Sequence, residues 1–243
     1  MRGNHAVLNG SLILSRLALT AVILSCSSLS VRSNSVPCPP LDVKRVTRAA
    51  SPEDAAPVWQ AFDSGVDYCA LRIKSPKLRA WALRVDLSRK DIGVTVSGKE
   101  PVKGIVRNGV VPSLKVTSFV RRSGCIAGIN TNPFSPVSAK EGESRTVVGV
   151  TIDKGAVVSP PDPQYDALVF YYNDGGGNGG GTAAVVSQEA LIDACGIAYA
   201  VGGFYRVLRQ GALPPPRSQA RHPRSAAGVS SDGKTLYLLV IDG

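Results

Sequence analysis

The sequence predicts an α+β fold, built on a mainly antiparallel sheet with hairpins and a few short helices. Two observations predict it. The 25 glycines and 17 prolines indicate many turns, and short apolar or alternating runs bounded by turn residues recur along the chain. A length of 243 residues, with 44% hydrophobic and 19% charged residues, is ordinary for one globular domain preceded by a targeting segment. These properties fit an α+β or all-β domain better than a helical bundle.

The chain is expected to comprise three parts. Residues 1–26 combine a basic start, the apolar run 17–24 and small residues, which is typical of an export signal and too short for a comfortable membrane span. Ile23-Leu24-Ser25-Cys26 resembles a bacterial lipobox, so Cys26 is a candidate lipidation site; an ordinary cleaved signal or a buried helix remains the alternative. Residues 27–57 predict a tether or linker, and residues 58–243 the domain. We therefore expect an exported protein of the periplasm or cell envelope, which would be held to the membrane through Cys26 if that residue is lipidated.

The net charge of +10 favours anionic partners such as phosphodiesters, acidic polymers or a lipid surface. Nucleic acid is disfavoured, because no recognised binding pattern is present and aromatic residues make up 6% of the chain.

Metal and cofactor sites are not expected. The five cysteines have no CxxC or Cys/His spacing, which argues against zinc. The glycine-rich stretch 174–181 leads into a short β-branched run rather than a helix, which argues against a nucleotide cradle and favours a loop between strands. Two disulfides or free thiols are both compatible with the remaining cysteines, which are Cys38, Cys69, Cys125 and Cys195.

The pattern of apolar residues places the elements before the C-terminal segment. Helices are predicted over residues 116–122 and, after Ser187 as a possible N-cap, over residues 188–194. Strands are predicted over residues 81–87, 92–96, 124–130, 146–152, 156–159, 166–172, 182–186 and 197–203.

The C-terminal segment predicts a hairpin with polar chemistry at one end. An apolar run over residues 225–230 reaches a turn containing Asp232-Gly233, and a second run over residues 235–241 returns. Arg221, His222 and Arg224 come before the first strand, and Asp242 follows the second. The hairpin therefore brings basic residues and a carboxylate to the same edge.

This order of residues resembles the phosphodiester glycosidase domain family. The resemblance rests on Arg-His-Pro-Arg at 221–224, the Asp-Gly-Lys turn, the apolar strand and Asp-Gly at 242–243. The segment Ile129-Asn130-Thr131-Asn132-Pro133-Phe134 is similar to the family's Ile-Asn-Gly-Gly-x-Phe element, with Thr131 and Asn132 replacing two glycines. Gly202-Gly203 begin a stretch similar to another family element, although Phe204 and Tyr205 depart from it. The resemblance covers about residues 59–243.

The resemblance implies an exported hydrolase that removes a sugar from a phosphodiester or a surface polysaccharide. Asp242 would stabilise the anomeric cation and His222 would donate a proton to the departing oxygen. Arg221 and Arg224 would bind the phosphate, whose two oxygens suit a guanidinium. Substrate-binding roles also fall to Asn130, Gly202 and Gly203, which would shape the pocket.

Two other interpretations stay open. Family domains continue after this Asp-Gly with a further long segment, so the domain is expected to be incomplete, and the chain could be a fragment of a longer enzyme. Alternatively, it could be an inactive, envelope-anchored module that binds anionic glycan.

Glycosidases commonly use two carboxylates. The candidates for a second catalytic carboxylate, each with less support than Asp242, are Asp86, Glu141 and Glu143.

Overall fold

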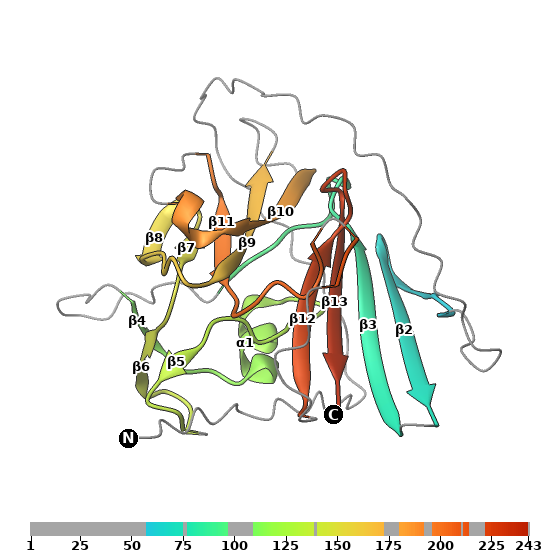
Figure 1. The fold of residues 1–243 in the computed structure, drawn as a ribbon, viewed down its shortest axis with the longest axis horizontal. Helices are drawn as coiled ribbons and strands as arrows, with labels where there is room; N and C mark the ends of the chain where they lie inside the picture. The colour runs from blue at the N-terminus through green and yellow to red at the C-terminus, as the bar shows by residue number, and fades with distance from the viewer. Residues whose placement is uncertain are drawn as a thin grey trace.

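The computed structural model describes residues 57–74, 77–96, 109–138, 140–172, 180–191, 196–209, 211–213 and 222–242. Three antiparallel sheets dominate these residues (Figure 1). They also contain one α-helix, α1 (Val116–Ser123), and one 3-10 helix, η1 (Gln188–Leu191). The prediction of a mainly antiparallel sheet with hairpins is confirmed, but the described fold is mostly β, so the α+β label fits it only loosely.

The first sheet joins two hairpins from distant parts of the chain. Its strand order is β1 (Gln60–Asp63), β2 (Val66–Ile73), β3 (Leu78–Asp86), β13 (Thr235–Ile241) and β12 (Arg224–Val229). The C-terminal hairpin, β12–β13, forms as the Asp-Gly turn predicts. Its strand β13 pairs with β3 along its whole length, from Thr235 opposite Asp86 to Ile241 opposite Ala80.

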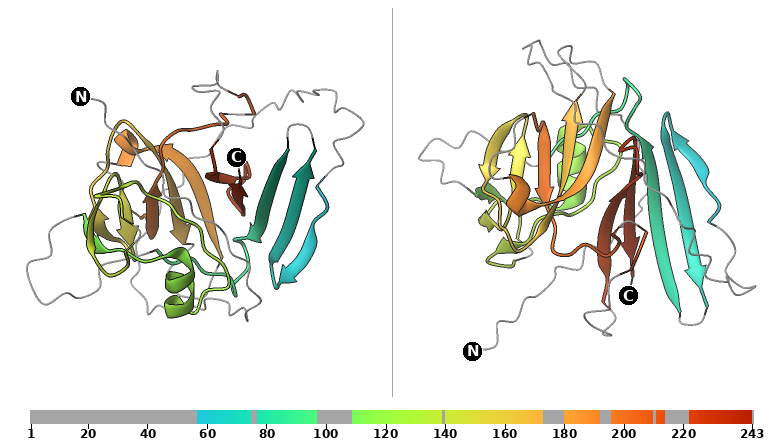
Figure 2. Two further views of the ribbon diagram at one scale, coloured as in Figure 1. Left: turned by 90° about the horizontal axis from the view of Figure 1, so that it is seen from below. Right: turned by 45° about the horizontal axis from the view of Figure 1, so that its top comes forward.

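The other two sheets are formed by the middle of the chain. The second sheet has the order β10 (Gly181–Ser187), β9 (Asp166–Tyr172), β11 (Tyr199–Gly202), β7 (Thr151–Asp153) and β8 (Ala156–Ser159). The third is small, with the order β4 (Val110–Pro112), β6 (Ser144–Val147) and β5 (Phe134–Ser135). Figure 2 shows the first and second sheets standing beside each other, with α1 near the third.

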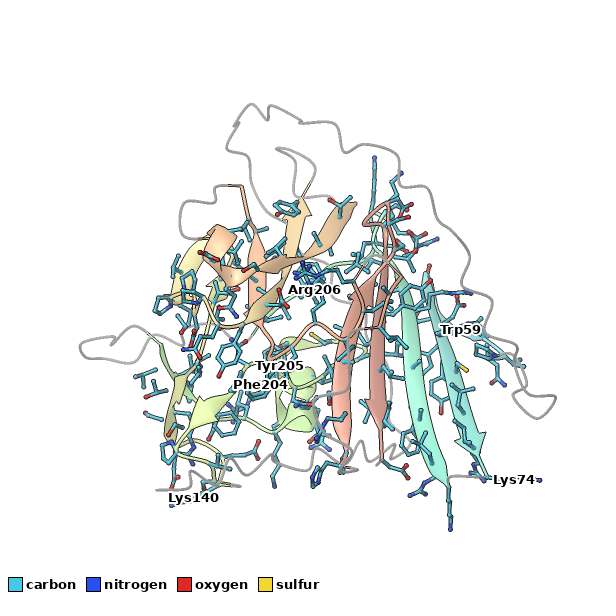
Figure 3. All side chains as sticks on the ribbon, viewed as in Figure 1. Trp59, Lys74, Lys140, Phe204, Tyr205 and Arg206 are labelled. Carbon is cyan, nitrogen blue, oxygen red and sulfur yellow. The ribbon has the colours of Figure 1, made fainter. Side chains whose placement is uncertain are left out.

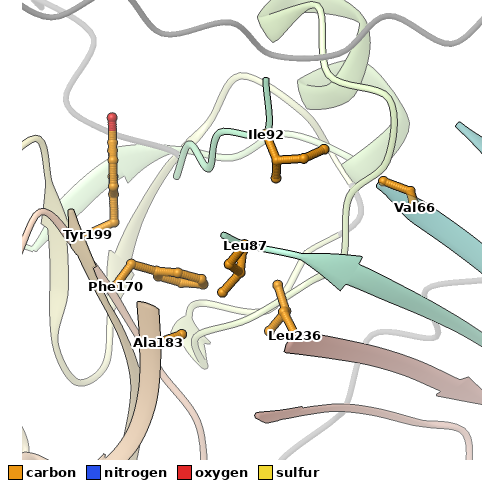
Figure 4. Close-up of a cluster of buried hydrophobic side chains, with 7 residues drawn as sticks. All are labelled: Val66, Leu87, Ile92, Phe170, Ala183, Tyr199 and Leu236. Carbon is orange, nitrogen blue, oxygen red and sulfur yellow. The ribbon is translucent and has the colours of Figure 1, made fainter. Parts of the chain in front are cut away.

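Apolar side chains from the first two sheets form a shared core, which Figure 4 shows in close-up. Burial of such side chains is the main favourable contribution to folding. A second cluster, which includes Val150, Val169 and Ala200, lies on the second sheet. The shared core consists of Val66, Leu87, Ile92, Phe170, Ala183, Tyr199 and Leu236.

The turn of the C-terminal hairpin fixes the first sheet to the second. Gly233 has a φ of 73°, which favours glycine, and its carbonyl oxygen accepts a hydrogen bond of 2.8 Å from the N–H of Ala183 in β10. A Cβ on Gly233 would lie 2.9 Å from the carbonyl oxygen of Ala183. Glycine is therefore needed here both for the turn and for the contact between sheets.

The predicted strand 146–152 is divided between β6 and β7, which belong to different sheets. Two other predicted strands are irregular in the structure. The run 124–130 is apolar because it packs on α1: Gly124 ends the helix with a φ of 63°, and a Cβ on Gly128 would lie 2.6 Å from a methyl carbon of Val120. The run 92–96 is not a strand in the structure; it places Ile92 in the shared core, with Val94 and Val96 packed against it. In both cases burial, rather than strand pairing, explains the apolar residues.

Both predicted helices begin where the structure has a helix. The helix over 116–122 is confirmed by α1. The segment after Ser187 forms the 3-10 helix η1, and the predicted continuation over 192–194 lies outside the described residues. The predicted export signal (1–26) and all of the linker (27–57) except Pro57 also lie outside them. Within the described ranges, no helix is long and apolar enough to cross a membrane.

Gln188, the first residue of η1, is a fully buried hydrogen-bonding centre. Its Oε1 accepts hydrogen bonds of 2.8 Å from the N–H groups of Val150 and Asp162. Its Nε2 donates one of 3.1 Å to the carbonyl oxygen of Asp166 at the start of β9. One side chain thus joins three segments of the second sheet and its loops.

Replacing Gln188 with leucine is expected to destabilise the protein by about 3 kcal/mol, because the buried N–H of Val150 and the partly buried N–H of Asp162 lose their acceptor. The free energy of unfolding in urea measures the effect. The matched control is Gln164→Leu, because Gln164 is exposed. Equal stability of the two variants would contradict this account of Gln188.

Candidate functional site

Three segments that carry sequence motifs meet in the structure. The Oδ1 of Asn130 accepts a hydrogen bond of 2.7 Å from the Oγ of Ser225 in β12. The Nδ2 of Asn132 lies 2.7 Å from the position that a Cβ on Gly202 would occupy. The Asn130 segment therefore lies between the C-terminal hairpin and the end of β11.

Asn132, one of the two residues that replace the family's glycines, has a structural role. The Nδ2 of Asn132 donates to the carbonyl oxygens of Val148, at 3.2 Å, and Val150, at 2.9 Å. A glycine at this position could make neither bond. Asn132 is thus more than a turn residue, because it ties the Asn130 segment to the chain that enters β7.

Asp242 is held by Arg79, which sequence reasoning did not identify. The Oδ1 of Asp242 accepts a hydrogen bond of 2.7 Å from the N–H of Arg79, and its Oδ2 accepts one of 2.6 Å from the Nε of Arg79. The backbone and side-chain hydrogen bonds from Arg79 lower the pKa of Asp242 below its ordinary value. The Asp242 carboxylate is therefore ionised at neutral pH.

Asp242 and Ser225 belong to the same face of the first sheet. Val240 pairs with both Ser225 and Trp81, so these three side chains share a face. The guanidinium of Arg79 lies over the Trp81 ring, 5.7 Å from its centroid, and also contacts Asp242. Asn130, Ser225, Arg79 and Asp242 together form what we call the hairpin-end site.

The basic residues of the motif are placed differently. Arg224 pairs with Ile241, so its side chain leaves the sheet on the face opposite Ser225, and its guanidinium donates to the carbonyl oxygen of Pro223 at 3.0 Å. Among the described residues no ion pair joins Arg224 to Asp242. His222 is exposed at the same end of the hairpin, and Arg221 lies outside the described residues.

Gly202 and Gly203 differ in their surroundings. Gly202 is buried against Asn132 and Gln188, and a Cβ there would lie 3.0 Å from the Nε2 of Gln188. Gly203 is more open, because the nearest atom to its Cβ position is the carbonyl oxygen of Asp166 at 3.7 Å. The Gly203 N–H donates to that same oxygen at 2.8 Å.

The residues after Gly203 form a second polar and aromatic group. Arg206 makes an ion pair of 2.7 Å with Asp166. Phe204 packs edge-on against Tyr165, with ring centroids 5.7 Å apart. Figure 3 shows Phe204, Tyr205 and Arg206 together, far from the end of the first sheet where Lys74 lies.

The other carboxylate candidates have local partners. Asp86 accepts a hydrogen bond of 3.0 Å from the N–H of Ser88, and it pairs with Thr235, at the opposite end of β13 from Asp242. Glu141 accepts one of 2.6 Å from the N–H of Lys115, which lowers its pKa. Glu143 makes ion pairs with Arg145 and with Lys140, the latter at 3.1 Å. These contacts place none of the three at the hairpin-end site.

A basic groove of about 610 Å³ opens beside Asp242. The sequence contained a signal for it, because basic and apolar residues alternate on both sides of the Ser75-Pro76 pair in Arg-Ile-Lys-Ser-Pro-Lys-Leu-Arg. The described residues that line it are Arg72, Ile73, Lys74, Lys77, Leu78, Arg79 and Asp242.

The cysteines and possible metal ligands add no further site. Cys69 and Cys125 are free thiols, and burial raises the pKa of Cys125. Within the part of the chain that the structure describes, no three His, Cys, Asp or Glu side chains are grouped to hold a metal ion. The lipidation candidate Cys26, with Cys38 and Cys195, lies outside the described residues.

Alanine substitutions should distinguish the two glycines. Gly202→Ala is expected to cost about 1–3 kcal/mol of stability, because its Cβ would overlap Asn132. Gly203→Ala should cost less than about 1 kcal/mol, because the space is open. Thermal unfolding of both, beside Gly228→Ala, which meets nothing within 4 Å, tests this. A Gly203→Ala variant as unstable as Gly202→Ala would refute it.

Comparison with known proteins identifies the family. Residues 123–243 match the family model described as phosphodiester glycosidase. No curated protein and no solved structure matches the chain. The matched segment contains α1's last residue, the Asn130 segment, Gly202-Gly203 and the whole C-terminal hairpin, which are the motifs from which the resemblance was drawn. The match places residues 123–243 of the chain in the phosphodiester glycosidase family.

Proposed function

We propose that the protein is a hydrolase that cleaves the bond between the anomeric carbon of a sugar and a phosphodiester oxygen. Family membership supports glycoside hydrolysis of phosphodiester sugars in general terms. The observation that carries the specific proposal is the Asp242 carboxylate, which two hydrogen bonds from Arg79 keep ionised at the end of β13. Such a carboxylate suits a reaction in which positive charge develops on the anomeric carbon.

The hairpin-end site offers groups for each part of such a substrate. Asp242 stabilises the anomeric cation. Arg79 uses its Nε for Asp242, and its side chain is 58% exposed, so its remaining N–H groups are available to phosphate oxygens. Asn130 and Ser225, which bond each other, are exposed and can exchange that bond for sugar hydroxyls. In this proposal Arg79 binds the phosphate, a role that the resemblance gave to Arg221 and Arg224, of which Arg221 lies outside the described residues.

The bond changes are those of a hydrolysis. The bond between the anomeric carbon and the phosphate oxygen breaks, and its electron pair leaves with the phosphate monoester. Water adds to the anomeric carbon, and its proton passes to solvent or to the departing oxygen through His222. A phosphate monoester is a good leaving group, so the reaction requires less acid assistance than cleavage of an ordinary glycoside does. This explains how one well-placed carboxylate can suffice.

Replacing Asp242 with asparagine should lower kcat at least about 100-fold, because an oriented charge is lost from the transition state. The assay measures free sugar released from a sugar 1-phosphate methyl diester.

The same assay tests the pH dependence. Because Arg79 lowers the pKa of Asp242, the wild-type rate should persist as the pH falls, until the pH is below the range in which carboxyl groups ordinarily titrate.

The matched control is Asp232→Asn, at the other end of the same hairpin, where an asparagine still accepts hydrogen bonds in the turn. An Asp242→Asn variant that retains the wild-type rate would refute the role of Asp242. Binding of anionic glycan by the wild-type protein, without turnover, would support the non-enzymatic module instead.

We also propose that the protein is exported and lipid-anchored through Cys26. The support is the basic start, the short apolar run and the lipobox-like Ile23-Leu24-Ser25-Cys26. Cys26→Ala should abolish incorporation of labelled fatty acid and release the protein from the membrane fraction. Cys38→Ala is the matched control, and a Cys26→Ala variant that still carries the label would overturn the proposal.

A further inference from the structure

The basic groove carries more positive charge than the hairpin-end site uses. It is formed by the end of the β2–β3 hairpin together with Asp242, at the end of the first sheet where Figure 3 labels Lys74. Among the described lining residues, four side chains are cationic and one is a carboxylate, which is an excess of three positive charges. In the described parts of the chain, Arg72, Lys74 and Lys77 make no ion pair, and all three are exposed.

The strand register holds these charges close together. Arg72 pairs directly with Arg79 across β2 and β3, and like charges at opposite positions repel each other. Asp242 offsets the charge of Arg79, whereas no carboxylate among the described residues pairs with Arg72 or the two lysines. An anion in the groove would remove this repulsion.

We propose that the groove binds a second phosphate group of a phosphodiester-linked anionic glycan, so that the substrate is a polymer rather than a single small phosphodiester. This rests on the proposed function, since Asp242 and Arg79 belong to both the hairpin-end site and the groove. A chain held at one phosphate by Arg79 would place the next against Arg72, Lys74 and Lys77.

The lining residues favour this ligand over other polyanions. Ile73 and Leu78 give the groove apolar surface that suits the carbon skeleton between phosphates, and Ile73 is 39% exposed. The described lining residues include no aromatic ring on which nucleic acid bases could stack.

The test measures binding of poly(glycerol phosphate), a polymer without a sugar 1-phosphate bond that the proposed reaction could cleave. Wild-type protein should bind it more tightly than glycerol phosphate, and binding should weaken as salt increases. Lys74→Gln/Lys77→Gln should weaken binding about fivefold to tenfold. The matched control is Lys90→Gln/Lys234→Gln, which removes the same charge from exposed positions at the opposite end of the sheet.

The outcomes separate this inference from the proposed hydrolysis. Polymer binding that weakens only in Lys74→Gln/Lys77→Gln supports the groove, even if no sugar phosphodiester is hydrolysed. Equal weakening in both double variants would mean a general charge effect and would overturn it. It would also be overturned if the protein hydrolyses a small sugar phosphodiester but binds the polymer no better than glycerol phosphate. Binding to vesicles of anionic lipid, without binding to the polymer, would overturn it in favour of a membrane surface.

Discussion

The Asn130 side of the candidate site depends on one buried amide. Gln188 occupies a space bounded by two glycines: a Cβ on Gly149 would lie 2.9 Å from its Nε2, and a Cβ on Gly202 would lie 3.0 Å from the same atom. Because the amide is satisfied by backbone groups of Val150, Asp162 and Asp166, it fixes the chain on both sides of it. Asn132 then uses the carbonyl of Val150, so the position of the Asn130 segment follows from that of Gln188.

The fold and the site were predictable where the signal was local. The Asp-Gly turn and its two apolar runs predict β12 and β13 closely, and the run 166–172 coincides with β9. The prediction of a strand over 124–130 was wrong, because a segment packed on a helix and a buried strand can have the same composition. Periodicity does not say which partner buries an apolar run.

The hairpin-end site shows the same limit. Asp242 and Asn130 could be singled out because each lies in a family motif. Arg79 could not, because it is 163 residues from Asp242 in sequence, and only the pairing of β3 with β13 brings them together. Conversely, the Arg-His-Pro-Arg motif suggested that Arg224 and Asp242 act together, whereas strand alternation sends Arg224 to the opposite face.

The hairpin turn fixes the position from which β13 extends to the hairpin-end site. Gly233 is docked on β10, and β13 runs from that point to Asp242 at its far end. The length of the strand therefore sets the distance between β10 and Asp242. One residue added to or lost from both strands would turn every side chain beyond it to the other face. A change of two residues would keep the faces but move Asp242 by about 7 Å. The exposed positions of the hairpin can therefore vary in sequence, but its length is tied to the chemistry proposed for its end.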